Sequence, residues 1–230
     1  TVAGKTMTVN GTLTVGDAGN SFNTTLDAGA IDLVVPGSVS IATKGIMKAP
    51  AGSMSSPHAT FSIGTNYTNS GTFTNNFGTV TFNATSSGKT LSGTLNGTSK
   101  FYNLILSGSG GEWTPGAALL ADGNLTVTAG TLAGTNNVTV NGGSVLGNGT
   151  INLTGGTFLA DGGGDFGGNT GWTFNTLNFG DGTGTASSRF FGSGAVTAAS
   201  STIALNQTLE GGAKTFNLTG NTTPLTATGT

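Results

Sequence analysis

The amino-acid sequence predicts an all-β fold, specifically a parallel β-helix (β-solenoid) of short strand-turn repeats. Three observations support this prediction: apolar and polar residues alternate in very short runs, turn-forming residues separate the runs, and the pattern recurs along the chain. The alternative is an antiparallel β-sandwich or jelly roll, which also contains many short strands. That fold needs strands of about 5–8 residues and no fixed register.

The composition excludes several other classes of protein. Gly, Thr, Ser and Asn make up 127 of the 230 residues, and charged residues make up only 7%, against about 25% in ordinary domains. A helical bundle needs Leu, Glu, Lys and Ala at helical spacing, and these are scarce. Apolar residues still make up 35% of the chain and include 13 Phe, so we expect a buried core rather than disorder.

The expected strands are short runs in which two apolar residues flank a polar one. Gly, Asn, Asp or Ser lies between the runs, and these residues close tight turns because they tolerate positive φ. A Gly-Thr-apolar tripeptide also recurs, as at residues 11–13, 78–80 and 130–132. The clearest runs are Met7–Val9, Leu13–Val15, Val39–Ile41, Val80–Phe82, Leu104–Leu106 and Leu125–Val127.

The middle of the chain carries a regular spacing. Leu125, Val138 and Ile151 lie 13 residues apart, and a second series with the same interval is formed by Leu132, Val145 and Phe158. This spacing predicts two short strands in each turn. Over the whole chain it gives about 17 turns and a rod of about 80 Å. Because the register drifts elsewhere, a three-sided coil of about 20 residues per turn is the alternative.

The residues between the apolar positions are expected to face solvent. Thr126, Thr139 and Asn152 each stand between two apolar residues of a predicted strand. If the turns stack in register, like residues form ladders along the outside of the coil. Thr suits the pleated surface, and Asn ladders form hydrogen bonds along the axis.

We expect residues 1–230 to form a single elongated β-solenoid unit with a loop insertion at residues 44–58. That segment contains two of the three Met and two of the five Pro, and Pro cannot donate to a β-ladder. The chain begins at Thr1 inside a strand-like pattern, without a basic and apolar leader. We therefore interpret it as a mature or trimmed piece of a longer precursor.

No residue pattern indicates catalysis. His58 is the single His and Arg189 the single Arg, the acidic residues are dispersed, and there is no Cys. Asp161, Asp165, Asn169 and Asp181 offer oxygen atoms of the kind that calcium binds. Their spacing does not match the repeated calcium-binding nonapeptide, so a Gly-rich turn is the preferred interpretation. We assign no catalytic, cofactor-binding or metal-binding residue and expect a non-enzymatic protein.

Composition also narrows the partners. A net charge of −2 with seven Lys and Arg in total argues against nucleic acid. No apolar run reaches about 18 residues, so no membrane-spanning helix is expected. Several Asn-x-Ser/Thr sequons, among them those at Asn10, Asn23, Asn83, Asn124, Asn137 and Asn217, are candidate glycosylation sites if the source modifies its surface proteins.

Longer stretches of the sequence resemble known repeats. The segments AGKTMTVNGTLTVG, FYNLILSGSGGEWT and DGNLTVTAGTLAGTNNVTVNGG are similar to repeats of bacterial surface β-solenoid proteins. This broad class includes autotransporter passengers and filamentous haemagglutinins. The segment FNLTGNTT resembles the autotransporter-associated strand repeat. The resemblance implies export, an extracellular or cell-surface location, and a role as fibre, adhesin or surface layer; it carries over no functional residue.

The function expected from these observations is structural. Strand-like sequence runs to both ends, and unpaired strand edges favour end-to-end stacking into a homopolymer such as a filament, sheath or surface layer. The segments TVAGKTMTVNGT and TFNLTGNTTPLTAT are the candidate contact strands. The alternative is an adhesin that binds glycans or a host surface, with Trp113 and Trp172 as candidates for stacking on sugars.

Overall fold

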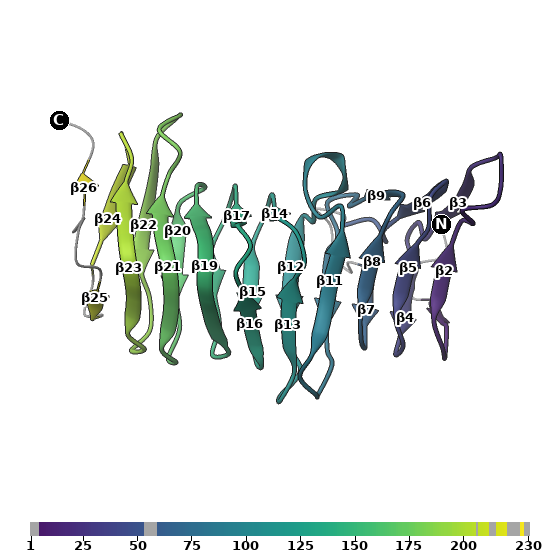
Figure 1. Cartoon of the computed structure of the whole chain (residues 1–230), viewed down its shortest axis with the longest axis horizontal. Helices are drawn as coiled ribbons and strands as arrows, with labels where there is room; N and C mark the ends of the chain where they lie inside the picture. The colour runs from purple at the N-terminus through teal and green to yellow at the C-terminus, as the bar shows by residue number, and fades with distance from the viewer. Residues whose placement is uncertain (1–4, 53–58, 206, 212–214, 220–225, 228–230) are drawn as a thin grey trace.

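The chain coils into a parallel β-solenoid of about nine turns, as the sequence predicts (Figure 1). The structure is a computed structural model that describes residues 5–52, 59–205, 207–211, 215–219 and 226–227. All strand pairs described are parallel, so the antiparallel sandwich is excluded. In the described part of the chain no helix is both long and apolar enough to cross a membrane.

The first face is a ten-stranded sheet with one strand from each turn. Its strands are β1 (Thr6–Thr8), β4 (Asp32–Val35), β7 (Thr60–Ile63), β10 (Thr79–Phe82), β12 (Asn103–Leu106), β15 (Leu125–Val127), β18 (Val145–Leu146), β20 (Gly164–Gly167), β22 (Ala186–Phe190) and β24 (Gln207–Glu210).

The second face is formed by the strands that follow these along the chain. They are β2 (Leu13–Val15), β5 (Val39–Ile41), β8 (Tyr67–Asn69), β11 (Lys89–Gly93), β13 (Glu112–Pro115), β16 (Thr131–Gly134), β19 (Thr150–Ala160), β21 (Trp172–Phe179), β23 (Val196–Ile203) and β25 (Phe216–Leu218).

The third face changes along the coil. In the first turns it is a small sheet of β3 (Thr24–Asp27), β6 (Gly45–Lys48) and β9 (Thr72–Thr74), followed by a short 3-10 helix, η1 (Gly97–Ser99). Then come β14 (Leu119–Ala121) and β17 (Val138–Val140); β14 pairs with β17, and β17 pairs with the second half of β19. Strands β19, β21 and β23 run through two faces without a break, and β26 (Thr226–Ala227) pairs with the end of β23.

The turns are longer than the sequence spacing predicts. Residues that stack directly on one another in the middle of the coil are separated by 21 residues (Asn103 to Asn124), 20 residues (Asn124 to Ser144) and 21 residues (Ser144 to Asp165). The shorter, two-stranded turn is therefore wrong, and the longer, three-sided alternative is confirmed. Side-chain hydrogen bonds between neighbouring turns of the whole coil join positions that are 19 residues to 28 residues apart.

The false period has a simple geometric origin. Leu125, Leu132 and Val138 are buried on three successive faces of one turn, in β15, β16 and β17. The chain advances 13 residues when it passes from one face to the second face after it, as from Leu125 to Val138. A full turn crosses three faces and is therefore longer than this interval. The series Leu125, Val138 and Ile151 thus moves from β15 to β17 to β19, while backbone pairing joins residues on the same face.

The core is a stack of apolar columns that runs the length of the coil. On the first face Leu33, Phe61, Val80, Leu104 and Leu125 follow one another, each at most 1% exposed. Burying a side chain of this size contributes roughly 1.5–3 kcal/mol relative to leaving it exposed. A single turn cannot bury this surface alone, so each turn depends on its neighbours for stability.

The segment predicted to be a loop insertion begins as regular structure. Lys44 has a positive φ of 70°, and the next four residues form β6, which pairs with β3 and β9. The prediction of a loop is therefore wrong for Gly45–Lys48. Residues 53–58, which include His58, lie outside the described residues.

Candidate functional site: turn corners and the two ends of the coil

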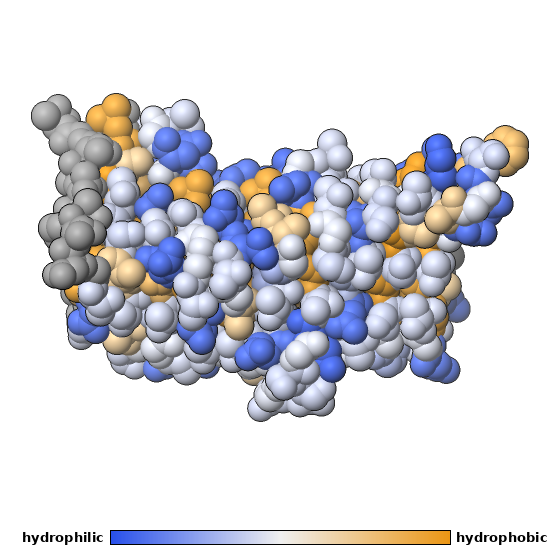
Figure 2. All heavy atoms as spheres, in the orientation of Figure 1, coloured by the Kyte–Doolittle hydropathy of each residue, from blue (hydrophilic) through white to orange (hydrophobic). Residues whose placement is uncertain are grey.

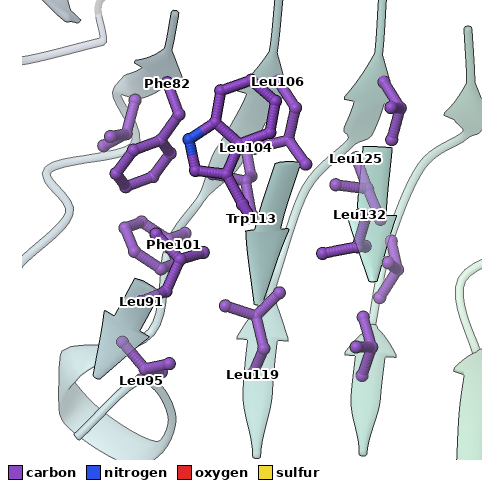
Figure 3. Close-up of a cluster of buried hydrophobic side chains, with 14 of the residues drawn as sticks. Phe82, Leu91, Leu95, Phe101, Leu104, Leu106, Trp113, Leu119, Leu125 and Leu132 are labelled. Atoms are coloured by element: carbon purple, nitrogen blue, oxygen red, sulfur yellow. The ribbon is translucent and has the colours of Figure 1, made fainter. Parts of the chain in front are cut away.

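The two tryptophans proposed for sugar stacking lie inside the core. Trp113 is 0% exposed and Trp172 is 1% exposed, so neither can contact a glycan. Trp113 lies in a cluster of buried side chains that includes Phe82 and Leu104 (Figure 3). The indole Nε1 of Trp172 donates a hydrogen bond to the carbonyl of Gly149 at 3.0 Å. The candidate role of these residues in adhesion is therefore corrected: both stabilise the fold.

The four residues considered as calcium ligands, Asp161, Asp165, Asn169 and Asp181, form hydrogen bonds or an ion pair with other groups of the protein. Asp165 forms an ion pair with Arg189 at 2.7 Å, and Asp161 Oδ1 accepts the backbone N–H of Asp181 at 2.8 Å. Asn169 Oδ1 accepts a backbone N–H from the next turn at 3.2 Å. Within the described residues, no three Asp, Glu or His side chains gather closely enough to hold a metal ion.

The two stacked carboxylates differ in their proton affinity. Burial raises the pKa of Asp161 above its ordinary value, and the neighbouring charge of Asp181 acts in the same direction. The pKa of Asp181 is lowered because Thr183 donates both its hydroxyl and its backbone N–H to the Asp181 carboxylate. Thr183 thus favours the ionised form of the Asp181 carboxyl group.

A polar column runs along the first face, at or just before the first residue of most strands and near the end of β22 and β24. One polar residue stands there in every turn, in register with the next: Thr6, Asp32, Thr60, Thr79, Asn103, Asn124, Ser144, Asp165, Arg189 and Glu210.

Hydrogen bonds join consecutive members of the polar column. Asn103 Oδ1 accepts the backbone N–H of Asn124 at 2.9 Å, and Asn124 Oδ1 accepts that of Ser144 at 2.7 Å. Ser144 Oγ in turn accepts the N–H of Asp165 at 3.1 Å. These side chains satisfy backbone donors at a corner where the strand ladder begins.

The expected ladders of like residues are broken at Thr126 and Thr139 but are present in part on the second face. Two outward columns there, each in register, are Thr14, Ser40, Thr68 and Ser92, and Asn152, Thr173, Thr197 and Asn217. Thr126 stands between Ile105 and Leu146, and Thr139 between Leu120 and Leu159. The prediction of uniform Thr and Asn ladders is wrong here because the true turn length brings different residues together. Short hydroxyl pairs do occur, such as Thr68 with Ser92 at 3.0 Å and Thr176 with Ser200 at 3.0 Å.

The core is incompletely covered at both ends of the coil. In the described residues, seven apolar side chains pack on the core while remaining partly exposed, and all lie in the first turn or the last two turns. They are Val9, Leu13, Leu26, Ile203, Leu209, Phe216 and Leu218. Met7, in β1, is 40% exposed, and Leu205, beyond β23, is 46% exposed. Apolar surface therefore gathers at the ends.

Strand edges are also open at these ends. Among the described residues β1 and β2 pair only with the following turn, and β24 and β25 only with the preceding turn. The sequence pattern located these end strands approximately. The predicted N-terminal contact segment contains β1, while β2 lies just after it.

The lateral surface is weakly polar and nearly uncharged, and Figure 2 shows a face coloured mainly white with scattered hydrophilic residues. A hollow of about 260 Å³ opens near the ends of β4 and β7 and is lined by Val34, Pro36, Ser62, Asn83 and Thr85 among others. None of its lining residues is charged. The hollow gives no sign of a particular ligand.

An exposed aromatic pair, not singled out by the sequence pattern, lies on one corner of the coil. Phe77 is 69% exposed, and its ring lies 5.2 Å from that of Tyr102. The sequence does contain a local indication of this pair. Phe77 stands in the turn sequence Asn-Asn-Phe-Gly, outside the alternation of apolar and polar residues that predicts buried side chains.

Comparison with protein-family models, with characterised proteins and with solved structures finds no match for this chain. The β-solenoid fold is confirmed by the geometry, and the closer resemblance to bacterial surface repeats stays a prediction.

Proposed function

We propose that this protein is a non-enzymatic structural subunit that assembles end to end, through strand pairing, into an extracellular filament, sheath or surface layer. The single observation that supports the proposal most is the gathering of partly exposed core residues in the first and last turns. Exposed apolar surface next to open strand edges favours pairing with another chain.

The two ends have matching side-chain patterns. In β2, Leu13 and Val15 face the core and Thr14 faces solvent; in β25, Phe216 and Leu218 face the core and Asn217 faces solvent. A second copy laid with β2 on β25 continues the parallel sheet and places apolar residues on apolar residues.

Such a contact joins different surfaces of the two copies. Contacts of this kind do not close on themselves unless the rotation between subunits closes a ring, so they produce open fibres. The axial rise of each subunit follows from its nine or so turns, at about 4.8 Å for each turn. We expect a repeat of about 45 Å along the fibre.

The location outside the cell is part of the proposal. The absence of Cys, the low charge and the abundance of Thr and Asn are typical of exported repeat proteins. The resemblance to autotransporter passengers and filamentous haemagglutinins supports the same location. The adhesin alternative loses its original candidates, since Trp113 and Trp172 are buried.

Thr14 allows a sharp test of the assembly. Leu13 donates its backbone N–H to Ser38 of the neighbouring turn at 2.9 Å, and successive peptide groups of a strand point in opposite directions, so the N–H of Thr14 points to the open edge. Thr14→Pro removes this donor at an edge position where Pro is tolerated. Thr14→Val keeps the donor and is the matched control.

Electron microscopy of purified protein at about 50 µM gives the readout. We expect filaments with the parent chain and with Thr14→Val, and dispersed particles with Thr14→Pro of unchanged circular dichroism. Monomeric parent protein at this concentration, or filaments of Thr14→Pro that equal those of the parent, would refute the proposal.

A further inference from the structure

Phe77 is held outward by a turn that a bulky residue rarely adopts. Asn76 and Phe77 have φ values of 46° and 55°, in the left-handed region, and link β9 to β10. Gly fills such a position without steric conflict, whereas the side chain of Phe conflicts with the backbone there. Because the phenyl ring is 69% exposed, it adds little to the core, and the fold does not explain its presence.

Hydrogen bonds fix this turn in place. Asn75 Oδ1 accepts the backbone N–H of Phe77 at 3.0 Å, and the carbonyl of Asn75 accepts that of Gly78 at 2.8 Å. Asn76 Nδ2 donates to the carbonyl of Ala49, in the preceding turn, at 2.8 Å. The backbone that carries the Phe77 ring is therefore held in place before any partner arrives.

Tyr102 extends the aromatic surface into the next turn. The two rings meet edge to face, with an interplanar angle of 78°. The neighbours of Tyr102 in register are Gly78 on one side and Gly123 on the other, because Thr79 pairs with Asn103 and Gly123 donates its N–H to the Tyr102 carbonyl at 2.9 Å. Neither glycine has a side chain that could cover the phenol ring.

Polar groups border the aromatic pair. Lys100, two residues before Tyr102, forms an ion pair with Asp122 at 2.6 Å, and Asn141 Nδ2 donates to Asp122 at 3.0 Å. Asp122 immediately precedes Gly123, so this group lies beside Tyr102 in the next turn. These residues supply a carboxylate, an ammonium and an amide group, all of which can form hydrogen bonds with hydroxyl groups. The positive charge of Lys100 balances the negative charge of Asp122.

We propose that Phe77 and Tyr102, with Asp122 and Asn141 at their border, bind a neutral carbohydrate chain. The C–H face of a pyranose ring stacks on the exposed phenyl ring, and its hydroxyl groups bond to the carboxylate and amide oxygens. The balanced charge disfavours an anionic ligand. The apolar area of two rings is small for a peptide groove. This site is separate from the ends of the coil and does not depend on assembly.

The probes for the test are cellohexaose, maltohexaose and chitohexaose, titrated one by one into the full chain and followed by NMR. Phe77→Gly relieves the strained φ and preserves the turn, so loss of binding in this variant is not a loss of folding. Phe22→Ala is the matched control, because Phe22 is an 82% exposed phenylalanine elsewhere on the surface. Asp122→Asn tests the polar border.

We expect at least one hexasaccharide to bind with a millimolar or lower Kd and to shift the ring resonances of Tyr102. Phe77→Gly should weaken that binding at least tenfold and Asp122→Asn several-fold, while Phe22→Ala leaves it unchanged. Absence of binding of all three sugars at 10 mM, or equal affinity of Phe77→Gly and Phe22→Ala, would overturn the proposal.

Discussion

Tyr67 offers the most direct test of how the core is packed. Its side chain is 0% exposed, and its ring contacts those of Phe73, Phe82 and Phe101 at centroid distances of 6.0, 6.1 and 5.6 Å. Its hydroxyl oxygen has no hydrogen-bond partner among the described residues. A buried polar group without a partner destabilises a fold by about 1–3 kcal/mol.

Tyr67→Phe removes the hydroxyl and retains all three ring contacts. We expect the free energy of unfolding to rise by about 1 kcal/mol, which corresponds to an increase in Tm of about 2–4 °C for a domain of this size. Urea denaturation followed by circular dichroism measures the change. Tyr102→Phe is the matched control, since its ring is half-exposed, and it should stay within about 0.5 kcal/mol of the parent.

The same residue predicts a pH dependence. Burial raises the pKa of Tyr67 above its ordinary value of about 10. The unfolded chain therefore loses the phenol proton at a lower pH than the folded chain does. The protonated phenol of Tyr67 therefore leaves the free energy of unfolding undiminished below about pH 10, and that free energy declines as the pH rises above this value. The decline should be smaller in Tyr67→Phe.

A decrease in stability of about 1 kcal/mol or more in Tyr67→Phe would refute this reasoning. It would mean that the hydroxyl has a bonding partner, such as a buried water molecule, inside the aromatic cluster.

Three further variants test the columns, the corners and the surface by urea denaturation. Leu104→Ala should lower the free energy of unfolding by about 3 kcal/mol, because a fully buried side chain leaves a cavity between two turns; a loss below about 1 kcal/mol would contradict continuous packing. Gly130→Ala should cost about 2 kcal/mol, since Gly130 has a φ of 76° and an added Cβ would lie 2.5 Å from the carbonyl oxygen of Gly108; an unchanged midpoint would show that this corner relaxes. Arg189→Ala should change stability by less than about 1 kcal/mol, because its ion pair with Asp165 is largely exposed; a larger loss would show that the ion pair contributes more than its exposure suggests.

The fold class could be predicted from sequence because strand alternation is a local property. Leu125 and Val127 flank Thr126, and the two apolar residues are indeed buried. The turn length could not be fixed in the same way. Val138 and Val145 both follow Leu125 as buried residues, and only backbone pairing, a non-local property, shows that Val145 is the one stacked on Leu125.

The candidate sites were harder to predict for a related reason. Trp113 could stack on a sugar or fill the core, and only its position relative to the neighbouring turns decides between them. Phe77 stands in a polar turn, where composition alone gives no reason to expect an ordered aromatic ring. The polar column could not be recognised because its members differ in identity and are unequally spaced, with steps that range up to the 28 residues between Asp32 and Thr60.

The orientation of the backbone hydrogen bonds has a mechanical consequence. They run along the axis of the coil on all three faces, so tension applied between the two ends separates them along their own direction, one turn after another. Each turn that detaches releases about 20 residues, or about 70 Å of extended chain, in place of about 5 Å of coil. A thread made of such subunits could therefore yield to a sudden pull by lengthening, well before any covalent bond is strained.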